Sequence, residues 1–116
     1  MTTLGPHLKI TAARTHRERL RDILTGALGL PLVHRGDAIE VFALGAGSVA
    51  FVYVDPADAL SEADARKGAW IELVVADPRA TGEALAAQGV EPFGYHDAAH
   101  SYFALPGGQV LRLAPA

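Results

Sequence analysis

Two segments of this chain have nearly the same pattern of residues, 61 positions apart (103 minus 42). FALGAGSVAF spans Phe42 to Phe51, and FALPGGQVLR spans Phe103 to Arg112. In each copy, apolar residues flank a glycine-containing turn, which is typical of a β-hairpin. A chain of 116 residues with such a repeat is expected to contain two copies of one structural unit, each of about 50 residues.

The first unit is expected over residues 5–54. A strand is predicted at 7–12, where apolar and polar residues alternate. A helix should begin at a capping box formed by Thr15 and Glu18 and end at Gly29, which suits a left-handed C-terminal cap. Three short strands are then expected at residues 32–35, 38–44 and 48–54.

A linker is expected over residues 55–69, which are small, charged and poor in large apolar side chains, with room for a short helical turn. The same order of elements is expected again in a second unit over 70–114, which begins with a strand at 70–75. Its helix should be capped by Asp77, with Pro78 in the first turn, and end at Gly89. Three further strands are expected near residues 91–95, 100–105 and 109–114.

The composition predicts one soluble domain over residues 1–116, because neither unit is large enough to bury its own sheet. Lys and Arg total 10 against 13 acidic residues, and the cations are scattered, so no nucleic-acid partner is expected. The absence of cysteine excludes disulfides, thiolate metal ligands and a thiol nucleophile. No apolar run approaches the roughly 20 residues of a membrane span, and the N-terminus does not look like a leader. We therefore expect a cytoplasmic protein without a membrane partner.

Four segments in this order carry a resemblance to a known family. They are His7 at the start of the first strand, LGL at 28–30, VVADPRATGEALAAQGV at 74–90 and FALPGGQVLRL at 103–113. Together they resemble the vicinal oxygen chelate superfamily, which includes glyoxalase I, extradiol dioxygenases and bleomycin-resistance proteins. The resemblance implies an α+β fold of two βαβββ modules, whose mixed sheets pair into a cup with the helices outside. It also implies a homodimer, in which the cup is formed within one chain or shared between two.

Strand alternation predicts which side chains line this cup. The faces expected beneath the helices carry Leu8, Ile10, Ala50, Val52, Ile71, Leu73, Val75, Leu111 and Leu113. The opposite faces, expected to contact a ligand, carry His7, Lys9, Thr11, Val49, Phe51, Tyr53, Trp70, Glu72, Val74, Val110 and Arg112. Phe42, Tyr95 and Tyr102 are further candidates, whose direction depends on the hairpin registers.

The resemblance also implies four metal-ligand positions, at the start of each unit's first strand and within its last strand. These positions hold His7, Phe51, Trp70 and Arg112. Phenyl and indole rings offer no lone pair to an ion, and a guanidinium repels one. A catalytic metal needs about three protein ligands, so we expect neither a metal nor another cofactor. The remaining route to a metal site is through other residues, such as His96 and His100.

The favoured interpretation is a binding protein that sequesters a hydrophobic aromatic or antibiotic-like small molecule, as in drug resistance. Aromatic side chains would stack on the ligand, and Arg112, Glu72 and His7 would fix its polar groups. A second interpretation is an enzyme of the same fold, a lyase or isomerase for example, with His7 or Glu72 as a metal-free base or with an unforeseen metal. A third is a structural or regulatory module in which Arg112 pairs with Glu72, Trp70 packs in the core and side chains fill the cup.

Overall fold

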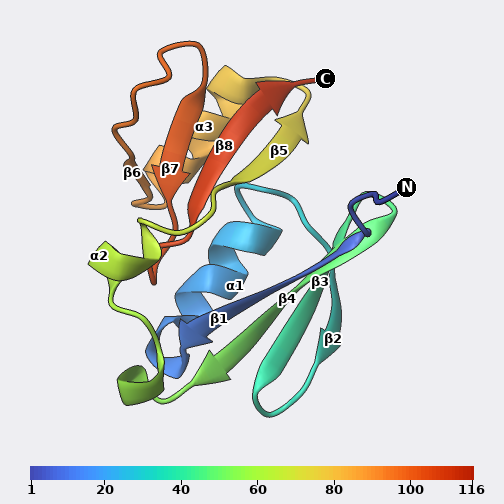
Figure 1. Ribbon diagram of the computed structural model, residues 1–116, viewed down its shortest axis with the longest axis vertical. Helices are drawn as coiled ribbons and strands as arrows, with labels where there is room; N and C mark the ends of the chain where they lie inside the picture. The colour runs from blue at the N-terminus through green and yellow to red at the C-terminus, as the bar shows by residue number, and fades with distance from the viewer.

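The computed structural model describes residues 1–116 and contains two four-stranded mixed sheets (Figure 1). The strand order is β1-β4-β3-β2 in the first sheet and β5-β8-β7-β6 in the second. In each sheet the first strand runs parallel to the last strand of its unit, and the remaining pairs are antiparallel. This is the α+β arrangement of two βαβββ modules that the sequence predicted.

The strands of the first module agree closely with the prediction, but its helix does not. The elements are β1 (His7–Ala13), the 3-10 turn η1 (Arg14–His16), α1 (Arg17–Thr25), β2 (Leu32–Arg35), β3 (Ile39–Leu44) and β4 (Gly47–Val54). The expected capping box of Thr15 and Glu18 is wrong, because Thr15 lies inside η1 and the helix begins after His16 without a side-chain cap. The helix also ends before the expected Gly29, although Gly29 does adopt the predicted left-handed conformation, with a φ of 63°. The chain leaves the helix after Thr25.

The second module follows a linker that contains two short helical segments. The elements are η2 (Pro56–Asp58), α2 (Glu62–Ala65), β5 (Ile71–Val75), α3 (Pro78–Ala87), β6 (Glu91–Pro92), β7 (Ser101–Ala104) and β8 (Val110–Pro115). Both predicted caps of α3 are confirmed, since Asp77 accepts a hydrogen bond from the Ala80 amide and Gly89 has a φ of 77°. Strand β6 is shorter than predicted. Pro92 has no N–H to extend the ladder, and residues 94–100 form a loop.

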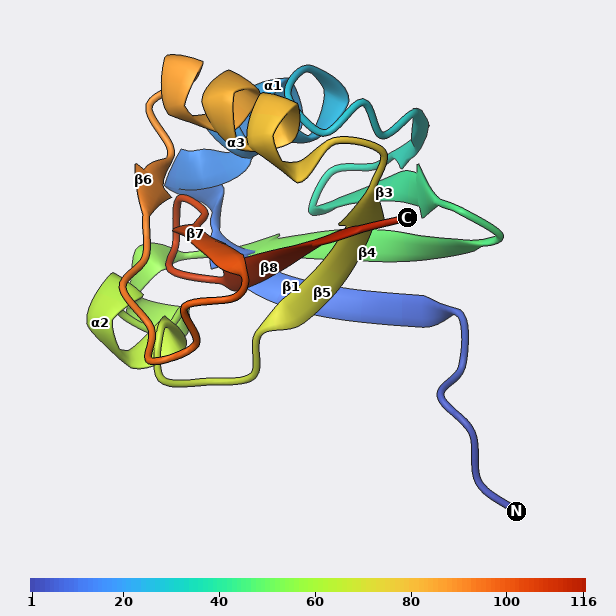
Figure 2. The same ribbon diagram turned by 90° about the horizontal axis from the view of Figure 1, so that it is seen from above.

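The helices of both modules lie on the same side of the sheets, where they share one hydrophobic core (Figure 2). Its fully buried side chains include Leu20 and Ile23 of α1, Leu85 of α3 and Leu113 of β8. The Gln88 side chain adds polar contacts between the modules, because it accepts from the Ala27 amide and donates to the Asp22 carbonyl. No helix is both long and apolar enough to span a membrane.

The predicted faces are correct in three of the four strands concerned and wrong in β4. Val49, Phe51 and Tyr53 are buried toward α1, whereas Ala50 and Val52 lie on the other face and are partly exposed. In β1, Ile10 lies opposite Phe51 and packs against the core, and Lys9 lies opposite Ala50. The side of each sheet away from the helices is called the open face below.

A difference in turn length explains the error in β4. In the first hairpin Leu44 pairs with Gly47, so two residues make the turn. In the second hairpin the Leu105 amide bonds to the Gln109 carbonyl, so three residues make the turn. A shift of one residue moves every later side chain to the other face of a strand. Ala50, and not Phe51, is therefore the structural counterpart of Arg112.

Candidate functional site

An aromatic cluster stands on the open face of the second module. The Tyr102 ring lies edge-on to Trp70, with ring centroids 6.1 Å apart, and tilts against Tyr95 at 4.8 Å. The guanidinium carbon of Arg112 lies 4.1 Å from the centre of the Trp70 ring, a cation–π contact. Tyr102 is buried, Trp70 is half-buried and Tyr95 is exposed. The three rings thus form a wall with an arginine at its centre.

Charged groups surround Arg112 on the same face. Its Nε and one terminal nitrogen donate to Oε1 of Glu72, at 2.9 and 2.5 Å. Its other terminal nitrogen lies 3.7 Å from Oδ2 of Asp97. That same oxygen accepts a hydrogen bond from the Tyr102 hydroxyl at 2.9 Å and lies 2.7 Å from Nδ1 of His100. Four ionisable side chains and a phenol therefore form one connected network.

The strand registers bring these residues together. Glu72 of β5 and Tyr102 of β7 both lie opposite Arg112, which occupies the strand between them. Trp70 immediately precedes β5, two positions before Glu72, so it shares that face. The loop of residues 94–100 carries Tyr95 back over Tyr102, as the ring contact shows. The alternation that the sequence predicted for this module is confirmed.

The network shifts the pKa values of three of its members. Hydrogen bonds from the Ala99 amide, His100 and Tyr102 hold the pKa of Asp97 below its ordinary value. Loss of solvent raises the pKa of Tyr102, although its hydrogen-bond contact with Arg112 opposes that change. Contacts with Tyr102 and then Glu72 raise the pKa of Arg112. At neutral pH the face therefore presents a fixed cation beside the ionised Asp97 carboxylate.

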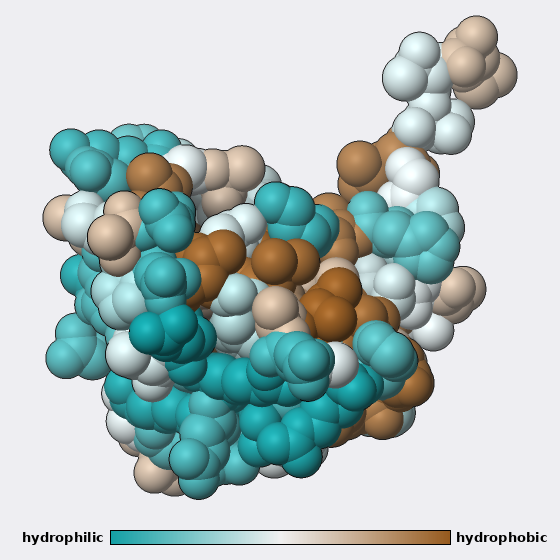
Figure 3. All heavy atoms as spheres, turned by 90° about the horizontal axis from the view of Figure 1, so that it is seen from below, coloured by the Kyte–Doolittle hydropathy of each residue, from teal (hydrophilic) through white to brown (hydrophobic).

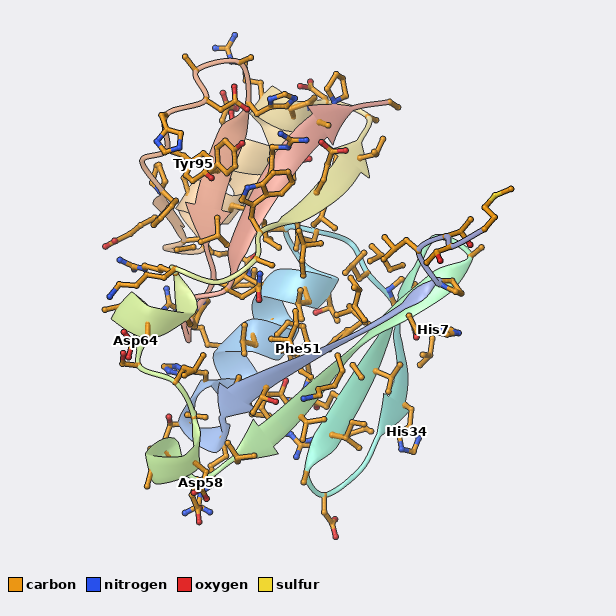
Figure 4. The ribbon with its side chains drawn as sticks, in the orientation of Figure 1. His7, His34, Phe51, Asp58, Asp64 and Tyr95 are labelled. Carbon is orange, nitrogen blue, oxygen red and sulfur yellow. The ribbon has the colours of Figure 1, made fainter.

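His7 and Lys9 lie on the open face of the first module. His7 Nδ1 is 2.7 Å from the Ser48 hydroxyl oxygen, and the Lys9 amine donates to the Thr11 hydroxyl at 2.9 Å. Figure 4 shows His7 well apart from Tyr95, which belongs to the other module. Within one chain, His7 therefore does not reach the Tyr95 end of the aromatic wall.

Three aromatic residues predicted to line the cup belong to the core instead. Phe42 and Phe51 are 0% and 1% exposed and pack edge to face beneath α1. Tyr53 stacks on Phe51, and its hydroxyl donates to the buried Glu40. Burial and the Glu40 charge raise the pKa of Tyr53. The expectation that these three side chains line the cup on the open face is wrong, because the β4 register reverses Phe51 and Tyr53, and Phe42 pairs with the buried Val49.

The residues present do not fit the metal that the fold family implies. With the corrected register, the four corresponding positions hold His7, Ala50, Trp70 and Arg112. Only the imidazole can donate to an ion. His96 and His100 do not rebuild a site, because no group of three histidine, aspartate or glutamate side chains is placed to hold one.

The sequence interpretation missed Asp97 and assigned no ligand contact to His100. Each lies less than one-third exposed beside Arg112 and Tyr102. A sequence signal was present in the D-x-x-H spacing, since an aspartate in a turn readily orients a histidine three residues later. The loop conformation that joins them to Arg112 depends on long-range contacts, which no local pattern encodes.

The aromatic wall lies on open surface, and none of the five main pockets is lined by Trp70, Glu72 or Arg112. A groove of about 460 Å³ runs beside it, between the free edge of β1, the linker and the β7–β8 turn. Lys9 and Thr11 line one side of this groove, and Ala69 and Gln109 line the other. Seen from below, apolar surface gathers beside the N-terminal segment, and much of the remaining surface is hydrophilic (Figure 3).

Solved structures with this architecture include proteins of the glyoxalase and fosfomycin-resistance type. Fosfomycin resistance protein FosX from Mesorhizobium loti is 19% identical, with a TM-score of 0.75, over 97% of this chain and 91% of that chain. FosX from Listeria monocytogenes is 12% identical, with a TM-score of 0.76, over 97% and 91%. The trypanothione-dependent glyoxalase I of Leishmania major is 14% identical, with a TM-score of 0.75, over 98% and 87%. No family model and no curated protein sequence matches the chain. The chain therefore has the α+β fold of these glyoxalase-type proteins, with the two modules that its sequence motifs predicted.

Proposed function

We propose that this protein binds a flat, hydrophobic small molecule against the wall of Trp70, Tyr95 and Tyr102. The observation that carries the proposal is the contact of Arg112 with the Trp70 ring, 4.1 Å from its centre, next to two further aromatic rings. Good aromatic pairs contribute about 0.5–1.5 kcal/mol each beyond the area they bury. Stacking therefore supplies affinity, and Arg112 supplies a donor for one polar group of the ligand.

The ion network suits such a ligand because it is already ordered. Glu72 and Asp97 hold the Arg112 guanidinium in place, so binding costs little additional side-chain entropy. A ligand carboxylate or carbonyl can share the guanidinium with Glu72. The likeness to fosfomycin resistance proteins supports a resistance-type role in which a cytoplasmic protein sequesters a toxic aromatic compound.

The proposed binding cup is completed by a second copy of the chain. Trp70 and Arg112 provide one wall, whereas His7 and Lys9 occupy the open face of the other module. In a homodimer, the first module of one copy would cover the aromatic wall of its partner. Each cup would then hold residues from two chains, and each chain would contribute to two cups.

Fluorescence of Trp70, the only tryptophan, tests ligand binding directly. We expect a panel of aromatic antibiotics to include a compound that quenches it saturably. Arg112→Gln should weaken that compound about tenfold, as expected for loss of a charged hydrogen bond. Arg79→Gln is the matched control, because Arg79 is exposed and pairs only with Glu83 on α3. A flat response across the panel would count against the proposal.

Complementation between inactive chains tests the shared cup. Trp70→Ala and the double variant His7→Ala, Lys9→Ala should each bind poorly when pure, measured by calorimetry. A mixed dimer contains one cup with both intact walls, so mixing the two variants should restore binding. Failure to restore it, with both variants dimeric by sedimentation, would mean that the cup forms within one chain.

A second candidate function, a metal-free enzyme, is favoured by the pairing of His100 with Asp97. The aspartate holds Nδ1 at 2.7 Å and leaves Nε2 available as a general base. Glu72 is a weaker candidate, because it is paired with Arg112. Turnover of a bound compound that survives chelation, and is lost in His100→Gln but kept in His96→Gln, would establish this function in place of simple sequestration.

A further inference from the structure

A buried carboxylate occupies the helix side of the first sheet, away from the aromatic wall. Glu40 of β3 is fully buried. One of its oxygens accepts from the Tyr53 hydroxyl at 3.0 Å, and the other accepts from Nε of Arg21 at 2.6 Å. An ionised group in such a position needs partners for both oxygens. These two hydrogen bonds satisfy that need.

Two further arginines converge on the same carboxylate. The Nε atoms of Arg17 and Arg35 each lie 3.5 Å from the Glu40 oxygen that Arg21 contacts. Three guanidinium groups therefore surround one carboxylate, an excess of two positive charges (3 minus 1). Stability of the carboxylate does not require this excess, because Arg21 and Tyr53 already satisfy Glu40.

The guanidinium groups of these three arginines differ in how many hydrogen bonds they form within the chain. Both terminal nitrogens of Arg17 donate to main-chain oxygens, those of Gly36 and Asp37. Arg21 and Arg35 direct only their Nε atoms at Glu40, and their terminal nitrogens form no hydrogen bond within the chain. The terminal nitrogens of both arginines are thus unoccupied, and a hydrogen bond to Glu40 holds Arg21 in place.

These two arginines line a groove between the start of α1 and the β2–β3 turn. Its volume is about 830 Å³, and none of its lining residues is hydrophobic. The lining residues are Arg14, Thr15, Arg17, Glu18, Arg21, Arg35, Gly36 and Asp37. The carboxylates of Glu18 and Asp37 form no ion pair, and Arg14 pairs with Asp55 outside the groove. Arg21 and Arg35 pair with Glu40 through Nε, and their terminal nitrogens remain as hydrogen-bond donors toward the groove.

We propose that this groove binds a phosphate group, either the free ion or the phosphate of a small phosphorylated molecule, through Arg21 and Arg35. The planar fork of arginine matches phosphate oxygens in pairs, and four arginines line the groove against the two carboxylates of Glu18 and Asp37. Because a hydrogen bond to Glu40 already orders Arg21, phosphate binding does not require that side chain to be immobilised anew. The site belongs to the first module and is independent of the proposed ligand wall.

Isothermal titration calorimetry of the intact protein tests the site, with inorganic phosphate and ribose 5-phosphate as probes in chloride buffer of constant ionic strength. We expect one phosphate per chain. Arg35→Gln should weaken binding about tenfold or more. Arg35 is the variant of choice because its side chain is 61% exposed and makes no hydrogen bond, so the fold should survive, as a circular dichroism melt will show. Arg35→Lys keeps the positive charge but lacks the planar fork, so its affinity for phosphate should lie between those of the wild type and Arg35→Gln.

The control is Arg79→Gln, which removes the same charge from an exposed pair on α3. Equal weakening by Arg35→Gln and Arg79→Gln would overturn the proposal, since it would indicate non-specific attraction. Absence of binding of either probe would overturn it as well. Tighter binding of ribose 5-phosphate would identify an organic phosphate, and equal binding would identify the free ion.

Discussion

The two sheets have the same strand order, but they place their charged groups on opposite faces. In the first module, Glu40 points toward α1 and is fully buried beneath arginines. In the second, Glu72 and Arg112 stand on the open face, with 38% and 21% of their side chains exposed. The same scaffold therefore carries one ionic cluster inside and another outside.

This difference gives the carboxylates of Glu40 and Glu72 different roles. A buried carboxylate has no water to replace a lost partner, so the hydrogen bonds that Glu40 accepts from Arg21 and Tyr53 are needed for folding. On the open face, water or a ligand can substitute for either member of the Glu72–Arg112 pair. Only the carboxylate of the second cluster can exchange partners at low cost, and only that cluster lies beside aromatic rings on the open face.

Deletion of Gly107 should have the largest effect on the fold. It shortens the second turn to the length of the first, so that Leu111 and Leu113 turn toward the open face and Arg112 toward the core. We expect loss of cooperative unfolding in urea. Insertion of one glycine beside Gly107 is the control, because a longer loop keeps the Leu105–Gln109 pairing and costs little. Similar unfolding curves for the two variants would show that turn length does not set the register.

Glu40→Gln should have the second-largest effect, a loss of about 3–5 kcal/mol in the free energy of unfolding. The neutral amide leaves Arg17, Arg21 and Arg35 close together without a counter-charge. Urea denaturation followed by circular dichroism measures the change. Glu83→Gln, on the exposed face of α3, should change stability by no more than about 0.5 kcal/mol. A loss as small as that of the control would place the carboxylate outside the stabilising core.

Low pH should weaken the charged network on the open face of the second module, over a pH range set by the pKa of Asp97. Its pKa is lowered in the folded chain, so its contribution is complete above its ordinary pKa, near 4, and disappears as the pH falls through the lowered value. The melting temperature of Asp97→Asn should lie below that of the wild type at pH 7, and the gap should close below about pH 4. A gap that stays constant from pH 7 to the acid limit would contradict this assignment.

Glu72→Gln should have the smallest effect on stability. The pair is partly exposed, and Arg112 keeps its contact with Asp97. We expect a urea midpoint within error of the wild type, together with altered Trp70 fluorescence, because Arg112 covers that ring. A stability loss comparable to that of Glu40→Gln would remove the distinction between the two faces.

Local sequence patterns predicted the strands and the architecture, because the alternation of apolar and polar residues and the position of turn glycines depend only on short segments of the chain. The start of α1 was mispredicted because η1 places Thr15 within a 3-10 turn, a choice made by neighbouring structure and not by the capping residues themselves. The aromatic wall was predicted in part, since Trp70, Glu72 and Arg112 share a face by alternation alone. Phe51 was misplaced because an ungapped repeat conceals one extra turn residue, and Asp97 was missed because only tertiary contacts bring its loop to Arg112.

At the level of the gene, the longer second turn amounts to a single additional codon. An in-frame insertion in a hairpin reverses the strand that follows it without changing any amino acid of that strand. After a duplication, one half of a protein can in this way turn former interior positions outward, and comparison of the halves by sequence alone will then pair residues that have no common environment.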